Sequence, residues 1–192
     1  NSSMQLSSFH GDRFAITDGE YDKEGNLWAI NSWSEEPLLV KTPEGTWSSF
    51  DCGSKSNGNI VSKMMINSNL GYKWLIFKDL NIIVYNDNET PLDKTDDEYQ
   101  LINNTVENGN LEYNATAIAE ELDEEVWIGT ERGIYVIYNP EDIFEEDGDF
   151  EAQRIKVEQD GNIEYLLEIA SKSKQYGIKK SLFLIFCLKM VS

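Results

Sequence analysis

The chain has 192 residues, of which 40% are hydrophobic and 11% aromatic, a composition typical of a soluble globular protein rich in β structure. The net charge is −19, and residues 1–168 hold all 35 acidic side chains against 11 basic ones, a local charge of −24. This acidity argues against nucleic-acid binding and against simple electrostatic attachment to anionic lipid, because both depend on Lys and Arg neutralising phosphate groups.

Residues 1–13 are polar and Ser-rich, and we interpret them as a leader or as the end of a preceding strand. A first unit is expected over residues 14–52. Aromatic and β-branched runs predict its four strands, at Phe14–Tyr21, Leu27–Asn31, Pro37–Lys41 and Thr46–Phe50. These short strands leave no room for a helix, so antiparallel hairpins are the economical connection.

Two further units of the same kind follow, at residues 59–103 and 114–158. The second unit has predicted strands at Val61–Asn67, Tyr72–Phe77, Asn81–Asn86 and Tyr99–Ile102. The third has predicted strands at Ala115–Glu120, Val126–Thr130, Ile134–Tyr138 and Ala152–Val157. Polar loops are expected at Asn86–Glu98 and Pro140–Phe150, and Tyr165–Leu167 should begin a fourth unit.

Three tryptophans give the units a common register. Trp28, Trp74 and Trp127 each begin or lie within a second predicted strand, and their spacings are 46 and 53 residues. Repeats of this size with four strands each predict a β-propeller, in which a bulky residue fills the space between blades. Propellers close with four to eight blades. The sequence therefore predicts an all-β, incomplete β-propeller of about three four-stranded antiparallel blades arranged as an open arc.

The residues around these tryptophans resemble the two-component regulator propeller repeat, with its pattern D-x-x-G-x-L-W-x-G-T followed by G-[IL]. The first unit has Ile30-Asn31 in place of Gly-Thr, the second keeps only the Gly and the Trp, and the third has Glu121 and Glu124 where Asp and Gly would stand. We interpret the matching residues as structural, with the tryptophans in the core: Asp22, Gly25, Asn26, Trp28, Gly71, Trp74, Trp127, Gly129, Thr130 and Gly133.

The order of segments from Gly25-Asn26-Leu27-Trp28 to Asp96-Asp97 is similar to the propeller region of the PorZ family, over about residues 12–168. That resemblance implies a non-catalytic scaffold of the type IX secretion system of Bacteroidota. It implies a periplasmic or cell-surface, outer-membrane-associated location and protein partners, with glycan or lipopolysaccharide contacts made by parts absent from this chain. The alternative is the extracytoplasmic glycan-sensing propeller of a hybrid two-component regulator with its own signalling partners, which uses the same blades.

No catalytic, cofactor or metal site is predicted. His10 is the only histidine and lies in the polar leader, so a Ser/His or Cys/His pair has no candidate. The acidic loops Asp93–Glu98 and Glu141–Glu151 lack the ligand spacing of a calcium loop. Cys52 and Cys187 lie in unrelated regions, so a disulfide between them is not expected. No ligand-binding residue is predicted, and the longest apolar run, Leu182–Leu188, is far shorter than a membrane-spanning helix.

The segment 169–192 differs from the rest of the chain. It holds five lysines and no acidic residue, and no further tryptophan follows at the repeat spacing. We interpret it as a non-propeller tail. It is either the out-of-frame product of an interrupted reading frame or a natural C-terminal segment, and the nucleotide sequence beyond codon 168 would decide between the two.

Overall fold

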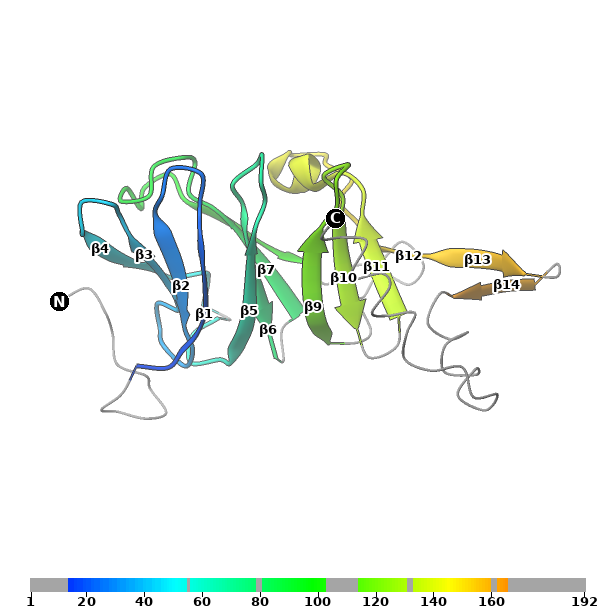
Figure 1. Ribbon diagram of the computed structural model, residues 1–192, viewed down its shortest axis with the longest axis horizontal. Helices are drawn as coiled ribbons and strands as arrows, with labels where there is room; N and C mark the ends of the chain where they lie inside the picture. Colours follow the sequence, from blue (N-terminus) through cyan, green and yellow to red (C-terminus); the bar gives the residue numbers. More distant parts are fainter. Residues whose placement is uncertain are drawn as a thin grey trace.

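The computed structural model describes residues 14–54, 56–78, 81–102, 114–130, 133–159 and 162–165. These residues form three four-stranded antiparallel sheets that follow one another along the chain and lie side by side (Figure 1). We refer to them as blades 1, 2 and 3. The prediction of an all-β chain with three four-stranded sheets is confirmed.

Each blade is a simple meander whose strands pair with their neighbours in sequence. Blade 1 contains β1 (Ile16–Tyr21), β2 (Leu27–Asn31), β3 (Leu38–Lys41) and β4 (Trp47–Phe50). Blade 2 contains β5 (Val61–Ile66), β6 (Lys73–Phe77), β7 (Asn81–Asn86) and β8 (Glu98–Ile102). Blade 3 contains β9 (Ala115–Glu120), β10 (Val126–Thr130), β11 (Gly133–Ile137) and β12 (Gln153–Arg154).

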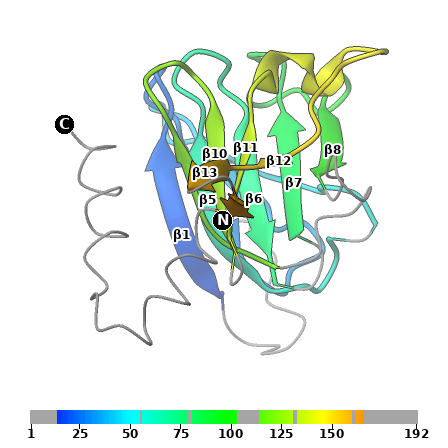
Figure 2. The same ribbon diagram turned by 90° about the vertical axis from the view of Figure 1, so that its right-hand side faces the viewer.

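The three tryptophans occupy the same position in the three blades. Trp28 is paired with Glu20 and Val40, Trp74 with Met65 and Val84, and Trp127 with Ala119 and Val136. The first strands β1, β5 and β9 contact one another in turn, and Figure 2 shows β1 and β8 on opposite sides of the molecule. The blades are thus joined along their first strands.

Two hydrophobic cores hold the blades together, and β6 contributes to both. Side chains alternate across a strand, so Leu75 and Phe77 face blade 1 while Trp74 and Ile76 face blade 3. In the core between blades 1 and 2, the ring of Trp28 lies 5.7 Å from that of Phe50 and 6.4 Å from that of Tyr85. Every residue of β6 is buried.

Blade 3 departs from the expected outline at its outer side. The outer strand was expected over Ala152–Val157, but β12 is only Gln153–Arg154, because residues 156–159 belong to a separate hairpin, β13 (Lys156–Gln159) with β14 (Asn162–Tyr165). The expected loop Pro140–Phe150 begins with a 3₁₀ helix, η1 (Pro140–Phe144). Its first residue is Pro140, whose fixed φ suits a helical start.

Several expectations fall on residues that the structure does not describe. They are the leader 1–13 with His10, the strand continuation Leu166–Leu167, and the tail 169–192 with Cys187. In the part that is described, no helix is long and apolar enough to cross a membrane.

Candidate binding pocket between blades 1 and 2

The turn between β1 and β2 is built around the carboxylate of Asp22. Its Oδ1 accepts hydrogen bonds from the backbone N–H groups of Glu24 (3.1 Å) and Asn26 (2.8 Å). Its Oδ2 accepts from Asn26 Nδ2 and from Trp28 Nε1, both at 2.8 Å. Gly25 lies at φ 84°, a left-handed conformation that glycine adopts without steric cost. These matching residues therefore fix the turn and orient the tryptophan beneath it.

The Asp22 carboxyl is electrostatically adapted to this role. Burial alone would raise its pKa, but the hydrogen bonds from Asn26 and Trp28 outweigh burial and hold the pKa below the ordinary value of 3.8. Lys73 of the neighbouring blade adds a favourable charge. The hydrogen bonds within blade 1 and the charge of Lys73 from blade 2 thus both favour the ionised form of Asp22.

The same turn is built from different residues in the other blades. Gly71 lies at φ 69° and Glu124 at φ 68°, in the place of Gly25. Trp74 Nε1 donates to Asn67 Oδ1, and Trp127 Nε1 donates to Glu125 Oε2 at 3.3 Å.

In blade 2 the partner of the tryptophan is Asn67, whereas the sequence alignment put Ser68 in the place of Asp22. In the turn of blade 2, the backbone N–H of Asn67 donates to the carbonyl of Tyr72. In the turn of blade 1, the backbone N–H of Asp22 donates to the carbonyl of Asn26, so the turn of blade 2 is one residue longer. The available signal for Asn67 was a polar residue at the very end of the predicted strand Val61–Asn67, and the structure ends β5 one residue earlier, at Ile66.

The remaining matching residues hold strands of blade 3. A Cβ on Gly129 would lie 3.3 Å from the Cβ of Ala117, so the glycine allows close strand approach. Thr130 Oγ1 donates to the carbonyl of Gly133 at 2.9 Å. Trp28 and Trp74 are fully buried, whereas Trp127 is only half-buried.

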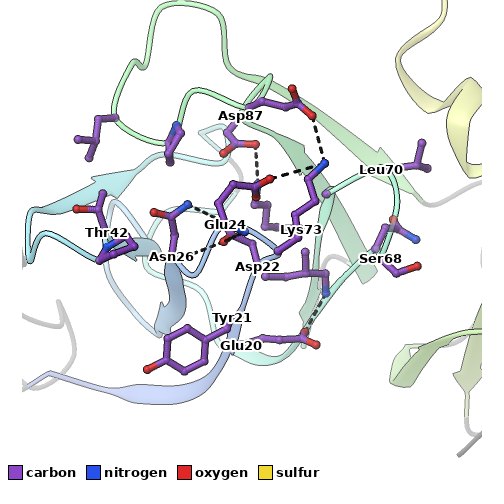
Figure 3. Close-up of a pocket in the computed structure, with 18 of the residues that line it drawn as sticks. Glu20, Tyr21, Asp22, Glu24, Asn26, Thr42, Ser68, Leu70, Lys73 and Asp87 are labelled. Carbon is purple, nitrogen blue, oxygen red and sulfur yellow. Dashed lines mark hydrogen bonds and ion pairs between the residues drawn. The ribbon is translucent and has the colours of Figure 1, made fainter.

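A pocket of about 840 Å³ opens between blades 1 and 2, where the turns of both blades meet the loop between β7 and β8 (Figure 3). The volume is within the range of small-ligand sites, roughly 300–1,000 Å³. The side chains that define its chemistry are mainly carboxylates, amides and exposed apolar groups: Glu20, Tyr21, Asp22, Glu24, Asn26, Thr42, Glu44, Asn67, Lys73, Asp87, Glu89 and Leu92.

The deepest charged group on the pocket wall is the ion pair of Lys73 with Asp87. Their Nζ and Oδ1 atoms are 2.6 Å apart, and their side chains are 3% and 8% exposed. Lys73 Nζ also lies 4.1 Å from the centroid of the Trp28 ring, at a cation–π distance. Burial lowers the pKa of Lys73, and Asp87 opposes that effect. This lysine is fully engaged inside the protein.

The rim of the pocket combines carboxylates with apolar side chains. Lys23 bridges the blades by pairing with Glu89 at 3.3 Å, and it also lies 3.8 Å from Glu24. Tyr21 and Leu92 are 67% and 47% exposed. A ligand in this pocket would meet negative charge and apolar surface together.

Glu20 connects the pocket to the first strands of the blades. Its Oε2 accepts from the backbone N–H of Ile66 at 2.9 Å. Burial is the main reason that its pKa is raised above 4.5, the Ile66 hydrogen bond opposes the rise, and the charges of Asp18 and Glu120 add to it. Like charges therefore accumulate on this side of the pocket.

The other candidate groups from the sequence have local structural roles. Cys52 is a buried free thiol in the core between blades 1 and 2, and burial raises its pKa. In the loop Asp93–Glu98, Asp93 accepts from Thr95, and Asp97 accepts from the Tyr85 hydroxyl. Among the residues that the structure describes, no three His, Cys, Asp or Glu side chains are placed to share a metal ion.

Comparison with known proteins gives a fold assignment. No protein-family model matches the chain, and no curated protein matches it in sequence. The structure is similar to that of PorZ, an essential bacterial surface component of the type IX secretion system of Porphyromonas gingivalis, with a TM-score of 0.76 and 21% identity. The chain is three blades of a β-propeller.

The similarity to PorZ covers 87% of this chain but only 24% of PorZ, so the chain spans about a quarter of the length of that protein. A second similar structure is the extracellular domain of a putative hybrid two-component system of B. thetaiotaomicron, BT3049. The match has 18% identity and a TM-score of 0.47, and covers 64% of this chain and 17% of the other. The resemblance to PorZ-like propellers noted in the sequence is thus matched at the level of fold.

Proposed function

We propose that this chain is part of a PorZ-like, non-catalytic binding scaffold that acts in type IX secretion and in the attachment of cargo to the cell surface of a Bacteroidota species. The observation that carries the proposal is the match to PorZ over 87% of the chain. In this proposal the protein is periplasmic or surface-exposed and associated with the outer membrane. Its partners are other proteins of the secretion assembly.

The pocket between blades 1 and 2 supports a binding role. It joins two blades, has the volume of a ligand site and is lined by ionised and apolar side chains that a partner can contact. Its carboxylates disfavour an anionic glycan or lipopolysaccharide, because like charges repel. Contacts with such molecules are therefore assigned to other parts of the protein.

Deletion of the gene in the bacterium that carries it tests the proposal. Loss of surface-attached cargo, restored by the wild-type gene but not by a gene that encodes Trp28→Ala, is the expected result. The Trp28→Ala variant removes a fully buried ring shared by blades 1 and 2 and serves as the misfolded control. Normal cargo attachment in the deletion strain would refute the proposal. So would an apolar span of about twenty residues followed by a kinase in the same gene, which supports the sensor alternative.

A further inference from the structure

The loop between β7 and β8 leaves blade 2 and extends over blade 1 (Figure 1). Both ends of this loop are fixed to blade 2. Asp87 is paired with Lys73 inside the protein, and Asp97 accepts a hydrogen bond from the hydroxyl of Tyr85. We refer to residues 88–96, which lie between these two anchors, as the strap. The strap is thus attached to one blade and lies on the other.

Hydrogen bonds within the strap hold it together. The hydroxyl of Thr90 donates to the carboxylate of Asp96 at 3.0 Å, and Nδ2 of Asn88 donates to the backbone carbonyl of the same residue. Asp93 accepts from the backbone N–H and from the hydroxyl of Thr95, at 3.0 and 2.7 Å. Compact surface loops that are packed by their own side chains are frequently functional. A loop bonded in this way can move as one unit without unfolding.

Two ion pairs hold the strap on blade 1. Glu89 pairs with Lys23 at 3.3 Å, and Lys94 pairs with Glu36 at 3.6 Å. Nζ of Lys94 also lies 5.2 Å from the centroid of the Phe50 ring. The four charged side chains are between 29% and 83% exposed, so water and salt weaken both pairs. The strap is therefore anchored to blade 2 by buried groups and joined to blade 1 by weak, exposed ones.

The start of the strap is under conformational strain. Asn88 and Glu89 directly follow the Asp87 anchor and have φ angles of 47° and 60°, in the left-handed region. Asn adopts this region more readily than other residues, whereas Glu is strained there. Such strain persists only where the surrounding contacts enforce it. The strain therefore favours release of the strap from blade 1, and the pair of Glu89 with Lys23 opposes that release.

The strap forms part of the wall of the pocket between blades 1 and 2. Glu89, Pro91 and Leu92 line this pocket together with the turns of the two blades. Movement of the strap away from blade 1 would withdraw these three side chains and release Lys23, which lines the same pocket. The position of the strap therefore sets the width of the pocket.

We propose that the strap is a lid that controls access to this pocket. In the closed state, which the structure shows, the two ion pairs hold the strap on blade 1. In the open state both pairs are broken, and residues 88–96 turn away from blade 1 about hinges beside Asp87 and Asp97. The inference rests on the proposed function for the use of the pocket as a binding site, whereas the motion of the lid is a property of the chain itself.

Distances between two spin labels on the full chain, measured by pulsed electron paramagnetic resonance, test this proposal. The first pair of labels, at Thr46→Cys and Thr95→Cys, joins exposed positions on the β3–β4 turn of blade 1 and on the strap. The second pair, at Thr46→Cys and Ser62→Cys, joins blade 1 to β5 and reports movement of the blades themselves. Cys187→Ser removes one native thiol, and the other, Cys52, is buried and therefore inert.

A matched pair of double variants separates the latches from other ion pairs. Glu89→Gln with Lys94→Gln breaks both latches and leaves the net charge unchanged. Glu151→Gln with Lys63→Gln makes the same two exchanges and breaks the 3.8 Å pair of Lys63 with Asp18, which joins the same blades away from the strap. We expect the first variant to raise the population with a longer distance between blade 1 and the strap at least threefold, and the control to leave it unchanged.

Three results would overturn the lid. They are an unchanged distance between blade 1 and the strap in the first double variant, an equal change in the control, and an equal lengthening of the distance between blade 1 and β5. The last result would mean that the blades separate as a whole. Salt gives a further test, because the Debye length falls to about 3 Å at 1 M. We expect 1 M NaCl to open the wild-type strap and to have no effect on the first double variant, and a closed wild-type strap at 1 M NaCl would contradict the role of the ion pairs.

Reversal of charge distinguishes a latch from a general disturbance of the loop. We expect Lys23→Glu and Glu89→Lys each to raise the open population at least threefold, because each places like charges together. The two substitutions combined restore an ion pair and should return the strap to the closed distance. Additive opening by the two substitutions would overturn the assignment of this pair as a latch.

The spin-label experiment and the secretion experiment can fail separately. A strap that opens as expected, with normal cargo attachment in the deletion strain, retains the lid and refutes the secretion role. Lost attachment, with a strap that keeps one distance in every variant, retains the secretion role and refutes the lid.

Discussion

Asp22 makes the β1–β2 turn depend on a charged carboxylate. Both of its oxygens accept two hydrogen bonds, from Glu24 and Asn26 on one side and from Asn26 and Trp28 on the other. In Asp22→Asn the new NH₂ group must face two donors, so some of these bonds are lost. We expect the free energy of unfolding to fall by about 1–3 kcal/mol, the cost of leaving buried donors unsatisfied. Urea unfolding followed by tryptophan fluorescence measures this change, and an unchanged midpoint would contradict it.

The same residue predicts a pH dependence. Because the pKa of Asp22 is held below 3.8 in the folded chain, the folded state binds fewer protons than the unfolded state between that lowered pKa and 3.8. Stability rises with pH wherever the unfolded state binds more protons. The contribution of Asp22 is thus fully present above pH 3.8 and is lost as the pH falls through the folded pKa. The difference in melting temperature between wild type and Asp22→Asn should shrink on acidification, and a difference that grows would contradict this sign.

Glu124 is a residue under conformational strain. It has φ 68° at the position where blades 1 and 2 have Gly25 and Gly71. A left-handed conformation costs an ordinary L-residue about 1–2 kcal/mol, and glycine avoids that cost. The side chain also accepts an exposed hydrogen bond from Asn69, which is worth less than the strain.

We therefore expect Glu124→Gly to raise the free energy of unfolding by about 0.5–1 kcal/mol, since the added freedom of the unfolded chain offsets part of the gain. Gly25→Ala, at the matching position in blade 1, is the control and should destabilise the protein. Chemical denaturation of both variants makes the comparison. A destabilised Glu124→Gly variant would mean that the contact with Asn69 outweighs the strain.

At the scale of the strand, equivalent tryptophans have different surroundings. Trp28 on β2 and Trp74 on β6 are fully buried in the two cores, and Trp127 on β10 is half-buried. Truncation of a buried Trp to Ala costs about 3–5 kcal/mol. We expect that loss for Trp28→Ala and a smaller one, about 1–2 kcal/mol, for Trp127→Ala in this chain. Thermal denaturation of the two variants checks the ranking, and equal losses would show that Trp127 is as well packed as Trp28.

The strands and their repeat were predictable because both are local properties of the sequence. Alternating apolar runs and Gly-containing turns define β2, β6 and β10, and the tryptophans set the register. The short β12 was not predictable, since it depends on competition with the hairpin of β13 and β14. The pocket between blades 1 and 2 could not be predicted from the sequence either. Thr42 and Glu44 of blade 1 are far in sequence from Lys73 of blade 2, and only the packing of the two blades brings them into one pocket.

At the scale of the whole molecule, blade 2 is shared by both cores. Among the residues that the structure describes, blade 1 shares its core with one face of blade 2, and blade 3 shares its core with the other face. In repeat proteins, stability is close to a sum of unit and nearest-neighbour terms. Loss of an outer blade therefore leaves one interface intact, whereas loss of the middle blade removes both.

Matched truncations of one buried isoleucine in each blade test this arrangement. Ile30, Ile76 and Ile128 are all fully buried, and Ile→Ala typically costs about 2–5 kcal/mol. We expect Ile128→Ala to speed amide hydrogen exchange in β9–β11 while β2 and β3 remain protected, and Ile30→Ala to do the reverse. Ile76→Ala should raise exchange in all three blades, because neither outer blade retains a core once β6 is lost. Uniform exchange in all three variants would show that the blades unfold as one cooperative unit and that the coupling between them exceeds the stability of any one blade.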